Sequence, residues 1–281
     1  MTGAARLAYL GPPGTNSEVA ALRACPDAEH VPYASVGAVV HALERGEVAG
    51  AVAAIENSLQ GSVTETVDLL IRDEGIAICG EVVLDIEHCL MVKPGMAADA
   101  ITVIYSHPQS LGQCREYLET HYPQVRTEAA LSNAAAVEEM LKSAQGAAIA
   151  PARAAEIYGA EILERDIQDS RVNKTRFVVL GRQGAAPTGH DKTSIAFAVA
   201  HDRPGTLVSV LHEFSDRAIN LTKIESRPSR EDLGVYVFLL DIEGHREDPL
   251  VAQALAAVKE QADFFKIFGS YPAWRPQAVS D

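Results

Sequence analysis

The sequence lacks the paired cysteines that a structural zinc site or a disulfide framework requires. Its four cysteines, Cys25, Cys79, Cys89 and Cys114, form no Cys-x-x-Cys pair and lie far apart in a chain of 281 residues. We therefore expect free, buried thiols in a protein of a reducing compartment.

Long apolar runs and an excess of basic residues are also missing. No stretch approaches the roughly 18 apolar residues of a membrane span, and Met1 to Leu10 leads into a strand without a long apolar core. The formal net charge of −14 argues against nucleic acid or an anionic membrane as the main partner. We expect a cytoplasmic protein, and a small anionic substrate remains compatible because a site needs only local cations.

Signatures of cofactors and metals are absent as well. The segment Gly11 to Gly14 follows a strand and opens a helix, but it is neither G-x-G-x-x-G nor a P-loop with Gly-Lys-Ser/Thr. The sequence has no paired metal-ligand motif and no Ser/His/Asp order. We predict neither a cofactor nor a metal.

What the sequence does contain is a regular alternation of strand-like and helix-period segments through the first 180 residues. This alternation predicts an α/β fold with a mostly parallel sheet. The segment Gly181 to Asp191 is rich in glycine, proline and polar residues and reads as a linker. We expect a catalytic region over 1–182, a linker over 183–192 and a second domain over 193–275.

The second domain has the element order of the ferredoxin-like βαββαβ unit. Its expected elements are Ser194–Val199, Leu207–Asp216, Leu221–Ser226, Gly234–Ile242, Leu250–Gln261 and Phe264–Phe268. Pro204-Gly205 turns into a helix whose first N–H groups could meet a carboxylate. Asn220-Leu221 and the run Glu225 to Pro228 frame the next strand. A hairpin with charged ends and an amino-acid pocket both fit these residues.

Small polar residues gather in the catalytic region where strands end and helices begin. Helix capping explains several of them individually. Taken together they predict one pocket for a small di-acid, because ligands of parallel sheets bind beyond the carboxyl ends of strands. The positions are Thr15, Glu56-Asn57-Ser58, Ser106-His107 with Gln109, Ser132, and Asn173 to Arg176, which directly precede a strand.

These segments, in their order and spacing, closely resemble the prephenate dehydratases of phenylalanine biosynthesis, with a C-terminal ACT regulatory domain. The resemblance covers nearly the whole chain, and we expect the monofunctional form, in which no chorismate mutase helices precede this region. Ala54, Arg203 and Thr206 depart from the usual family residues. The matching segments are Gly11-Pro12, Gly14-Thr15, Ile55 to Ser58, Gly61, Thr66 to Leu70, Ser106 to Gln109, Thr175 to Phe177, Gly205 to Val208, Glu225 to Pro228 and Gly269 to Pro272.

The resemblance implies a carbon–oxygen lyase that converts prephenate to phenylpyruvate, CO2 and water and is inhibited by L-phenylalanine. It implies two lobes like those of periplasmic binding proteins, roughly 1–78 with 160–182 and 79–159, and a homodimer or homotetramer with phenylalanine at ACT–ACT interfaces. We expect Thr175 to protonate or hydrogen-bond the departing hydroxyl and Arg176, or another cation, to hold a carboxylate.

The remaining site residues are assigned by group. Asn173 is expected to act with Thr175 and Arg176. Substrate contacts are expected from Thr15, Glu56, Asn57, Ser58, Ser106, His107, Gln109, Ser132 and Phe177. Effector contacts are expected from Gly205, Thr206, Leu207, Asn220, Leu221, Glu225, Ser226, Arg227 and Pro228.

Two other readings stay open. Arogenate dehydratase differs only in an amine that replaces the side-chain ketone of the substrate. A non-catalytic amino-acid sensor could be built from the same bilobal and ACT parts. The sequence leaves undecided the role of Glu56, the cation for each carboxylate, the oligomer size and the response to tyrosine or tryptophan.

Overall fold

The computed structural model describes residues 5–199, 204–229 and 236–275, and the chain divides into two compact units. One unit combines residues 1–66 with 82–177, and the other combines 67–81 with 178–281. Among the described helices, none has the length and apolarity needed to span a bilayer. All four cysteines are free thiols.

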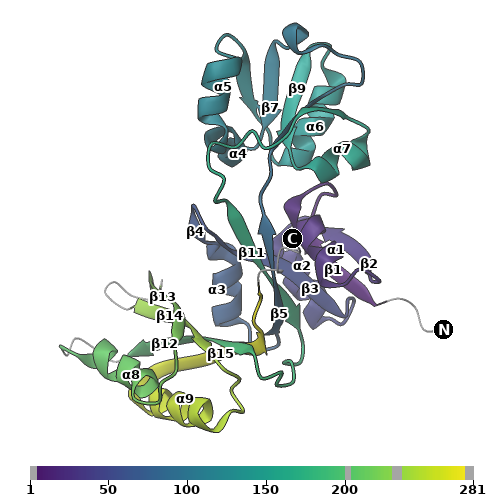
Figure 1. The fold of residues 1–281 in the computed structure, drawn as a ribbon. Helices are drawn as coiled ribbons and strands as arrows, with labels where there is room; N and C mark the ends of the chain where they lie inside the picture. Colours follow the sequence, from purple (N-terminus) through teal and green to yellow (C-terminus); the bar gives the residue numbers. More distant parts are fainter. Residues whose placement is uncertain (1–4, 200–203, 230–235, 276–281) are drawn as a thin grey trace, which may run out of the picture. The chain divides into compact units, whose positions relative to one another are not determined.

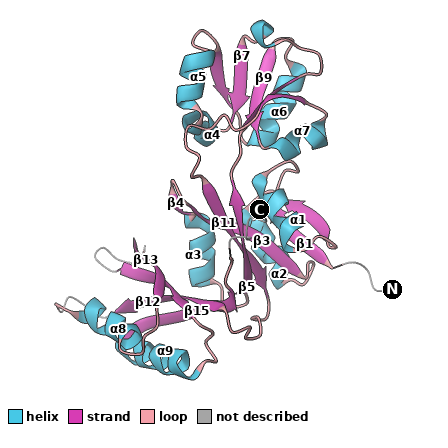
Figure 2. Ribbon diagram, in the orientation of Figure 1, coloured by secondary structure: helices cyan, strands magenta, loops and turns pink. Residues whose placement is uncertain are grey.

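The first unit consists of two lobes of alternating strands and helices, as Figures 1 and 2 show. The first lobe contains β1 (Arg6–Leu10), α1 (Asn16–Ala24), β2 (Glu29–Tyr33), α2 (Val36–Glu44), β3 (Gly50–Asn57) and β4 (Gly61–Ser62). Strand β1 pairs in parallel with β2 and β3. Strand β3 is almost continuously buried along GAVAAIEN, which is typical of a parallel strand covered by helices on both faces.

The second lobe is built on a mixed five-stranded sheet with the order β10-β6-β9-β7-β8. Strand β7 pairs in parallel with β8 and β9, whereas β6 pairs antiparallel with β9 and β10. Its elements are β6 (Cys89–Val92), η1 (Ala98–Ala100), β7 (Val103–Ser106), α4 (Pro108–Gln113), α5 (Arg115–His121), β8 (Arg126–Ala129), α6 (Asn133–Lys142), β9 (Gly146–Ala150), α7 (Ala152–Tyr158) and β10 (Glu161–Glu164).

Two crossing strands connect the lobes. The chain follows helix α3 (Thr64–Arg72) and strand β5 (Ala77–Asp85) into the second lobe and returns along β11 (Lys174–Gly181). Both crossing strands belong to the first-lobe sheet, whose order is β2-β1-β3-β11-β5. This architecture confirms the expected fold class. Residues 161–164 differ from expectation, because β10 pairs with β6 in the second lobe and not with the first-lobe sheet.

The second domain has the βαββαβ order that the sequence predicts. Its four-stranded sheet runs β13-β14-β12-β15 and is antiparallel throughout. The expected strand start at Gly234 lies outside the described residues. The elements are β12 (Asp191–Val199), α8 (Thr206–Ser215), β13 (Leu221–Pro228), β14 (Tyr236–Glu243), α9 (Pro249–Gln261) and β15 (Ala262–Pro272).

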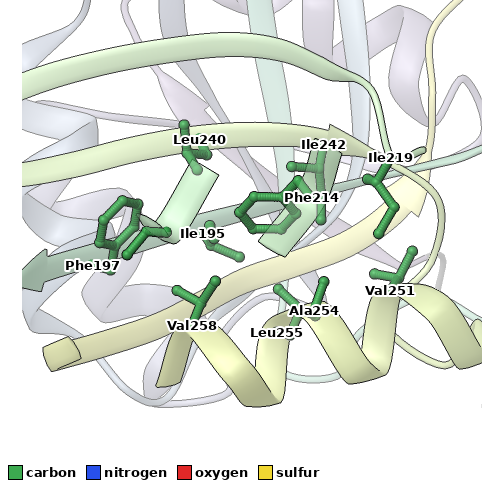
Figure 3. Close-up of a cluster of buried hydrophobic side chains, with 11 residues drawn as sticks. Ile195, Phe197, Phe214, Ile219, Leu240, Ile242, Val251, Ala254, Leu255 and Val258 are labelled. Atoms are coloured by element: carbon green, nitrogen blue, oxygen red, sulfur yellow. The ribbon is translucent and has the colours of Figure 1, made fainter. Parts of the chain in front are cut away.

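The core of this domain lies between the sheet and its two helices (Figure 3). Ile195 and Phe197 lie two residues apart on β12, so both point to the same face of the sheet, toward Leu255 and Val258 of α9. Phe214 of α8 completes this group. All five side chains are almost completely buried. Each buried side chain of this size contributes about 1.5–3 kcal/mol, so this cluster is the main source of the domain's stability.

Gly269 of β15 lies against the backbone of β5. A Cβ atom at this position would lie 2.0 Å from the carbonyl oxygen of Ile78. The two strands can approach this closely only because residue 269 has no side chain. This contact attaches the sheet of the second domain to residues 67–81 of the same unit.

Gly269→Ala should therefore destabilise the protein. Overpacking of this kind costs about 1–3 kcal/mol, which corresponds to a fall of roughly 2–12 °C in the melting temperature of a domain of this size. Scanning calorimetry of the variant measures it. Gly37→Ala is the control, because the added Cβ meets only Ser35 Oγ at 3.8 Å in helix α2. An unchanged melting temperature for Gly269→Ala would contradict the close approach.

Candidate functional site

The first unit contains a cavity of about 610 Å³ between side chains of both lobes. This volume lies within the range of small-molecule sites. The cavity is lined by Leu10, Gly11, Pro12, Thr15, Asn16, Ser17, Ala34, Asn57, Ile86, His88, His107, Gln109, Ser110, Gln113, Leu131, Ser132, Asn133, Ala135 and Thr175.

Two longer helices begin at this cavity. Helix α1 is capped by Thr15, whose Oγ1 accepts from the N–H of Glu18 at 3.4 Å. Helix α6 is capped by Ser132, whose Oγ accepts from the N–H of Ala135 at 3.0 Å. The N-terminal end of a helix carries partial positive charge and N–H groups without intrahelical partners. The cavity can therefore attract an anion although no lysine or arginine is among its described lining residues.

A directed chain of hydrogen bonds forms the polar wall of the cavity. The backbone N–H groups of Leu59 and Gln60 donate to Asn57 Oδ1 at 3.0 and 3.2 Å. Because backbone N–H groups are always donors, Asn57 must turn its Nδ2 toward the opposite side. There Nδ2 donates to Asn173 Oδ1 and to Thr175 Oγ1, both at 2.9 Å. The Thr175 oxygen thus accepts from Asn57, and its own O–H remains available to donate into the cavity.

The chain continues through two further side chains. Asn173 Nδ2 donates to Gln113 Oε1 at 3.0 Å, and His88 Nε2 lies 2.8 Å from the same oxygen. With its oxygen committed, Gln113 Nε2 is a buried donor that has no partner among the described residues. Desolvation by burial lowers the pKa of His88, and the hydrogen bond to Gln113 only partly opposes this shift.

Six of the residues selected from the sequence line the cavity: Thr15, Asn57, His107, Gln109, Ser132 and Thr175. Asn173 is 3% exposed and belongs to the hydrogen-bond chain. Ser106 is fully buried and donates to Ile149 O at 2.7 Å, which makes it a support of the second lobe. Ser58 Oγ donates to Val172 O at 3.0 Å and accepts from the N–H of Lys174.

The structure differs from expectation at Arg176, Glu56 and Phe177. Arg176 Nη2 pairs with Glu56 Oε2 at 3.0 Å, and neither side chain is among the lining residues. Successive residues of a strand point to opposite faces, so Arg176 faces away from the side occupied by Thr175. Phe177 is 2% exposed and lies in the core.

Gln113 and His88 line the cavity but were not selected from the sequence. Gln113 follows Gln109 by four residues on helix α4, so the two lie on one helix face, and this spacing could have identified it. His88 precedes a buried strand and carries no motif of its own. Only the fold brings it to the cavity.

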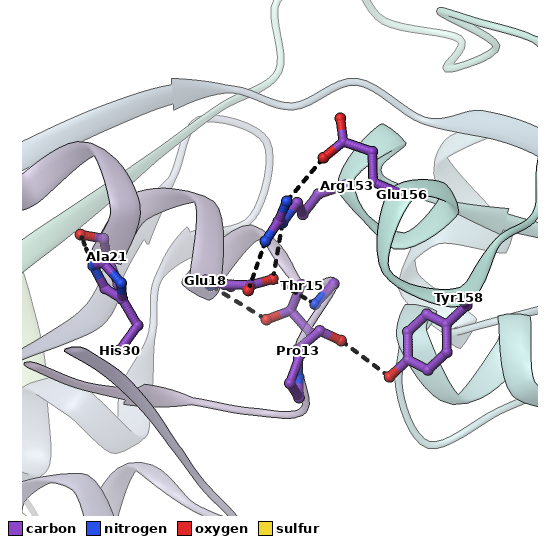
Figure 4. A network of polar contacts seen from close by, with 9 residues as sticks. Pro13, Thr15, Glu18, Ala21, His30, Arg153, Glu156 and Tyr158 are labelled. Atoms are coloured by element: carbon purple, nitrogen blue, oxygen red, sulfur yellow. Dashed lines mark hydrogen bonds and ion pairs between the residues drawn. The ribbon is translucent and has the colours of Figure 1, made fainter. Parts of the chain in front are cut away.

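An ion pair joins the lobes beside the cavity (Figure 4). Glu18 of α1 is 7% exposed and pairs with Arg153 of α7 at 3.3 Å. The Glu18 carboxylate also accepts from the N–H of Gly14 at 2.6 Å. Burial, reinforced by the Glu18 charge, raises the pKa of Tyr9 to about 12. At 7% exposure the Glu18 carboxylate is poorly hydrated, and Arg153 is its paired counter-charge.

The same contact between lobes includes Gly14 and Tyr158. Tyr158 Oη donates to Pro13 O at 3.1 Å (Figure 4). Gly14 has a φ of +88°, and a Cβ there would lie 3.1 Å from Ala154 Cα. The turn before α1 therefore requires glycine for its backbone conformation and for close approach of α7.

The residues proposed for an effector lie in the second domain. Gly205 has a φ of +93° and precedes α8, which starts at Thr206 and Leu207, whereas Arg203 lies outside the described residues. Asn220 Nδ2 donates to Glu243 Oε1 at 3.1 Å before β13 begins at Leu221. On β13, exposure alternates: Ser226 and Pro228 are exposed, and Glu225 and Arg227 are partly buried.

Arg227 and Glu225 each form an ion pair with a residue of opposite charge. Arg227 Nη2 pairs with Asp68 Oδ1 of α3 at 2.6 Å, and both side chains are largely buried. Glu225 pairs with Lys223 at 3.2 Å. No group of three or more His, Cys, Asp or Glu residues within the described ranges is arranged to hold a metal ion.

Comparison with known proteins identifies family models that match most of the chain. A model described as prephenate dehydratase matches residues 7–185, and one for the ACT domain matches residues 193–260. A prephenate dehydratase of Corynebacterium glutamicum is 39% identical, with 96% of this chain and 89% of the relative covered. A bifunctional chorismate mutase/prephenate dehydratase of Stutzerimonas stutzeri is 43% identical, with 95% of this chain and 73% of the relative covered.

A crystal structure of prephenate dehydratase from Arthrobacter aurescens in complex with L-Phe is also similar. It has a TM-score of 0.88 at 33% sequence identity and covers 98% of this chain and 93% of its own. The family models, the identities over nearly full length and the bilobal fold agree. The chain belongs to the prephenate dehydratase family and carries that family's ACT domain at its C-terminal end.

Proposed function

We propose that the chain converts prephenate to phenylpyruvate, CO2 and water. The observation that carries the proposal is the orientation of Thr175, whose oxygen accepts from Asn57 and whose O–H is free to donate into the cavity. A hydroxyl donor of this kind suits a substrate whose reaction is driven by the formation of an aromatic ring.

The electrons and protons balance in a single fragmentation. The bond between the ring and its carboxylate breaks, and CO2 leaves. The electron pair moves into the ring, the bond to the para hydroxyl breaks, and the departing hydroxide takes a proton through Thr175 to become water. Solvent then returns the proton to the threonine. The donation from Asn57 to Thr175 Oγ1 polarises the hydroxyl and fixes its direction.

The lack of lysine and arginine among the described lining residues fits this reaction. A carboxylate that becomes CO2 loses its charge in the transition state. A cation bound to it would stabilise the substrate more than the transition state and would slow the step. The partial charges at the N-terminal ends of α1 and α6 attract the substrate's carboxylates more weakly than a full cation would. The amide donor of Gln113 is a further contact for a substrate oxygen.

The reaction requires the lobes to close around the substrate and exclude water. The pair between Glu18 and Arg153 is suited to hold this closed arrangement, because it joins α1 and α7 directly beside the cavity. Ser106, Ser58 and the pair of Glu56 and Arg176 support the walls from behind.

Regulation by L-phenylalanine belongs to the same proposal. The effector would place its carboxylate at the first N–H groups of α8 after Gly205 and its side chain along β13. Arg227 takes a different role from the one first assigned to it, because it is already paired with Asp68. We assign it to the connection between β13 and α3. A homodimer or homotetramer in the cytoplasm completes the proposal.

The first test follows phenylpyruvate formation from prephenate. Thr175→Val keeps the shape but removes the hydroxyl, so kcat should fall by about 10²–10⁴-fold with a smaller change in KM. Thr175→Ser should keep most of the activity. A Thr175→Val variant with unchanged kcat would remove threonine from the mechanism.

A parallel assay with arogenate as substrate decides between prephenate dehydratase and arogenate dehydratase. Binding of either compound without turnover would favour a sensor.

Loss of the pair between lobes should weaken substrate binding. In Arg153→Met the buried Glu18 carboxylate loses its main counter-charge, which should destabilise the closed arrangement of the lobes by about 1–3 kcal/mol. This cost is lower than that of breaking a fully buried pair, because Arg153 is partly exposed. KM should rise about tenfold while kcat stays within about twofold. Steady-state kinetics of Glu156→Gln is the control, since Glu156 contacts Arg153 from the exposed surface at 2.9 Å. Equal effects of both variants would contradict the assignment.

Asp68→Asn should weaken inhibition by phenylalanine. Arg227 would lose its charged partner in α3, and the coupling between effector and reaction, usually about 1–3 kcal/mol, should decrease. The inhibitory concentration should then rise about fivefold or more, while calorimetry without substrate should still detect phenylalanine binding. Asp216→Asn removes an exposed acid of the same domain and is the control. Unchanged inhibition in Asp68→Asn would exclude this connection.

A further inference from the structure

His88 lies in the loop between β5 and β6, lines the cavity and is 2% exposed. The reaction proposed above uses Thr175, Asn57 and Gln113 but assigns His88 no part. A buried imidazole at a cavity wall is costly to desolvate unless its polar atoms have partners. Its partners therefore indicate what it does.

The ring and the backbone of His88 are both anchored by glutamines. The backbone N–H donates to Gln168 Oε1 at 2.9 Å, which holds the residue in place. The ring atom Nε2 lies 2.8 Å from Gln113 Oε1. The identity of this oxygen is fixed independently, because Asn173 Nδ2 donates to the same atom and Asn173 is oriented by Asn57.

The protonation state of the ring follows from this contact. Gln113 Oε1 is an acceptor, so His88 must carry a hydrogen on Nε2. Burial lowers the pKa of His88, which favours the neutral ring at pH 7, with Nδ1 unprotonated. In agreement, Nδ1 is buried and has no hydrogen-bond partner among the described residues, as a neutral ring nitrogen tolerates better than an imidazolium N–H does.

A single hydrogen bond would hold the Gln113 amide poorly. The terminal torsion of a glutamine has a broad energy profile and is not fixed by rotamer preference. Donors from Asn173 on one side and His88 on the other occupy both acceptor positions of Oε1. Only the orientation with Oε1 toward these donors avoids a contact between two N–H groups, so the amide nitrogen is directed away from them.

We propose that His88 is a positioning residue: its neutral imidazole fixes the Gln113 amide so that the amide N–H groups meet an oxygen of the substrate. His88 acts through Gln113 and does not exchange a proton with the substrate. The proposal rests on the proposed function, since it assigns a role within that site. It adds a residue that the sequence motifs do not mark.

A double-mutant cycle tests the proposal by comparing His88→Leu, Gln113→Leu and the double variant. Loss of one hydrogen bond to a buried amide should lower kcat/KM about 10-fold in His88→Leu. Because both residues act as one unit, the double variant should lose no more than about threefold beyond Gln113→Leu alone. Losses that multiply in the double variant would overturn the proposal.

Conservative variants separate positioning from a merely structural role. Glutamine carries its amide nitrogen at about the same distance from the backbone as Nε2 of histidine, so His88→Gln should recover most of kcat/KM. His88→Asn is shorter and should not. His30, a partly buried histidine that contacts Ala21 O and Cys25 O, provides the control: His30→Gln should leave kcat/KM unchanged. Equal kcat/KM in His88→Gln and His88→Leu would overturn the proposal.

Nitrogen NMR of the full-length protein tests the contact without turnover. The signal that disappears in His88→Gln should report a neutral ring with hydrogen on Nε2 at pH 7, and Gln113→Leu should disturb that signal. Hydrogen on Nδ1 alone, or an imidazolium, would overturn the proposal. Failure of the proposed function would appear separately, as an absence of phenylpyruvate with the unsubstituted protein.

Discussion

The direction of the Asn57 amide determines the chemistry of the cleft. The N–H groups of Leu59 and Gln60 can only donate, so they fix Asn57 Oδ1, and every later hydrogen bond in the chain inherits its direction. Asn57 then donates to Asn173 and Thr175, and Asn173 donates to Gln113. A turn of backbone at the end of β3 thus decides which hydrogens face the cavity. Side chains that could each adopt two orientations are held in one.

This arrangement suits a reaction that needs neither a strong acid nor a nucleophile from the protein. The donors that the cavity offers are hydroxyl and amide groups, and its positive potential comes from helix ends, with no lysine or arginine among the described lining residues. Weak, well-directed donors stabilise a hydroxide as it leaves without holding the carboxylate that must lose its charge. A strong cation at that carboxylate would improve binding and slow the reaction. The polarity of the site is therefore consistent with its proposed chemistry.

The sequence predicts the elements better than it predicts the contacts. Helix α9 was expected over Leu250–Gln261 and spans Pro249–Gln261, because its apolar period and its proline start are local signals. The helical period of the sequence over Leu111–Thr120 predicts a single helix, whereas the chain forms two, α4 and α5, which meet at Cys114 with a φ of −116°. Asn57 and Thr175 are predicted as site residues because both are polar and lie at an end of a predicted strand. Nothing local distinguishes Thr175 from Arg176, since the face of a strand that meets a ligand depends on how the sheet packs. His88 could not be predicted from the sequence, because only the packing of the fold brings it to the cavity.

The second domain contacts α3 and β5, and β5 leads the chain toward the cavity. The contacts that attach it to residues 67–81 include Gly269 on Ile78, Arg227 with Asp68, Lys192 with the buried Glu81, and Lys266 with Ile71 O. Asp68 lies in the middle of α3, and Ile78 and Glu81 lie in the first half of β5. Strand β5 continues toward Ile86, whose N–H donates to Asn173 O at 2.8 Å. Asn173 is itself part of the chain that orients Gln113. This continuity is the route by which the proposed effector, bound to the second domain, would change the hydrogen-bond geometry at Thr175 and Gln113.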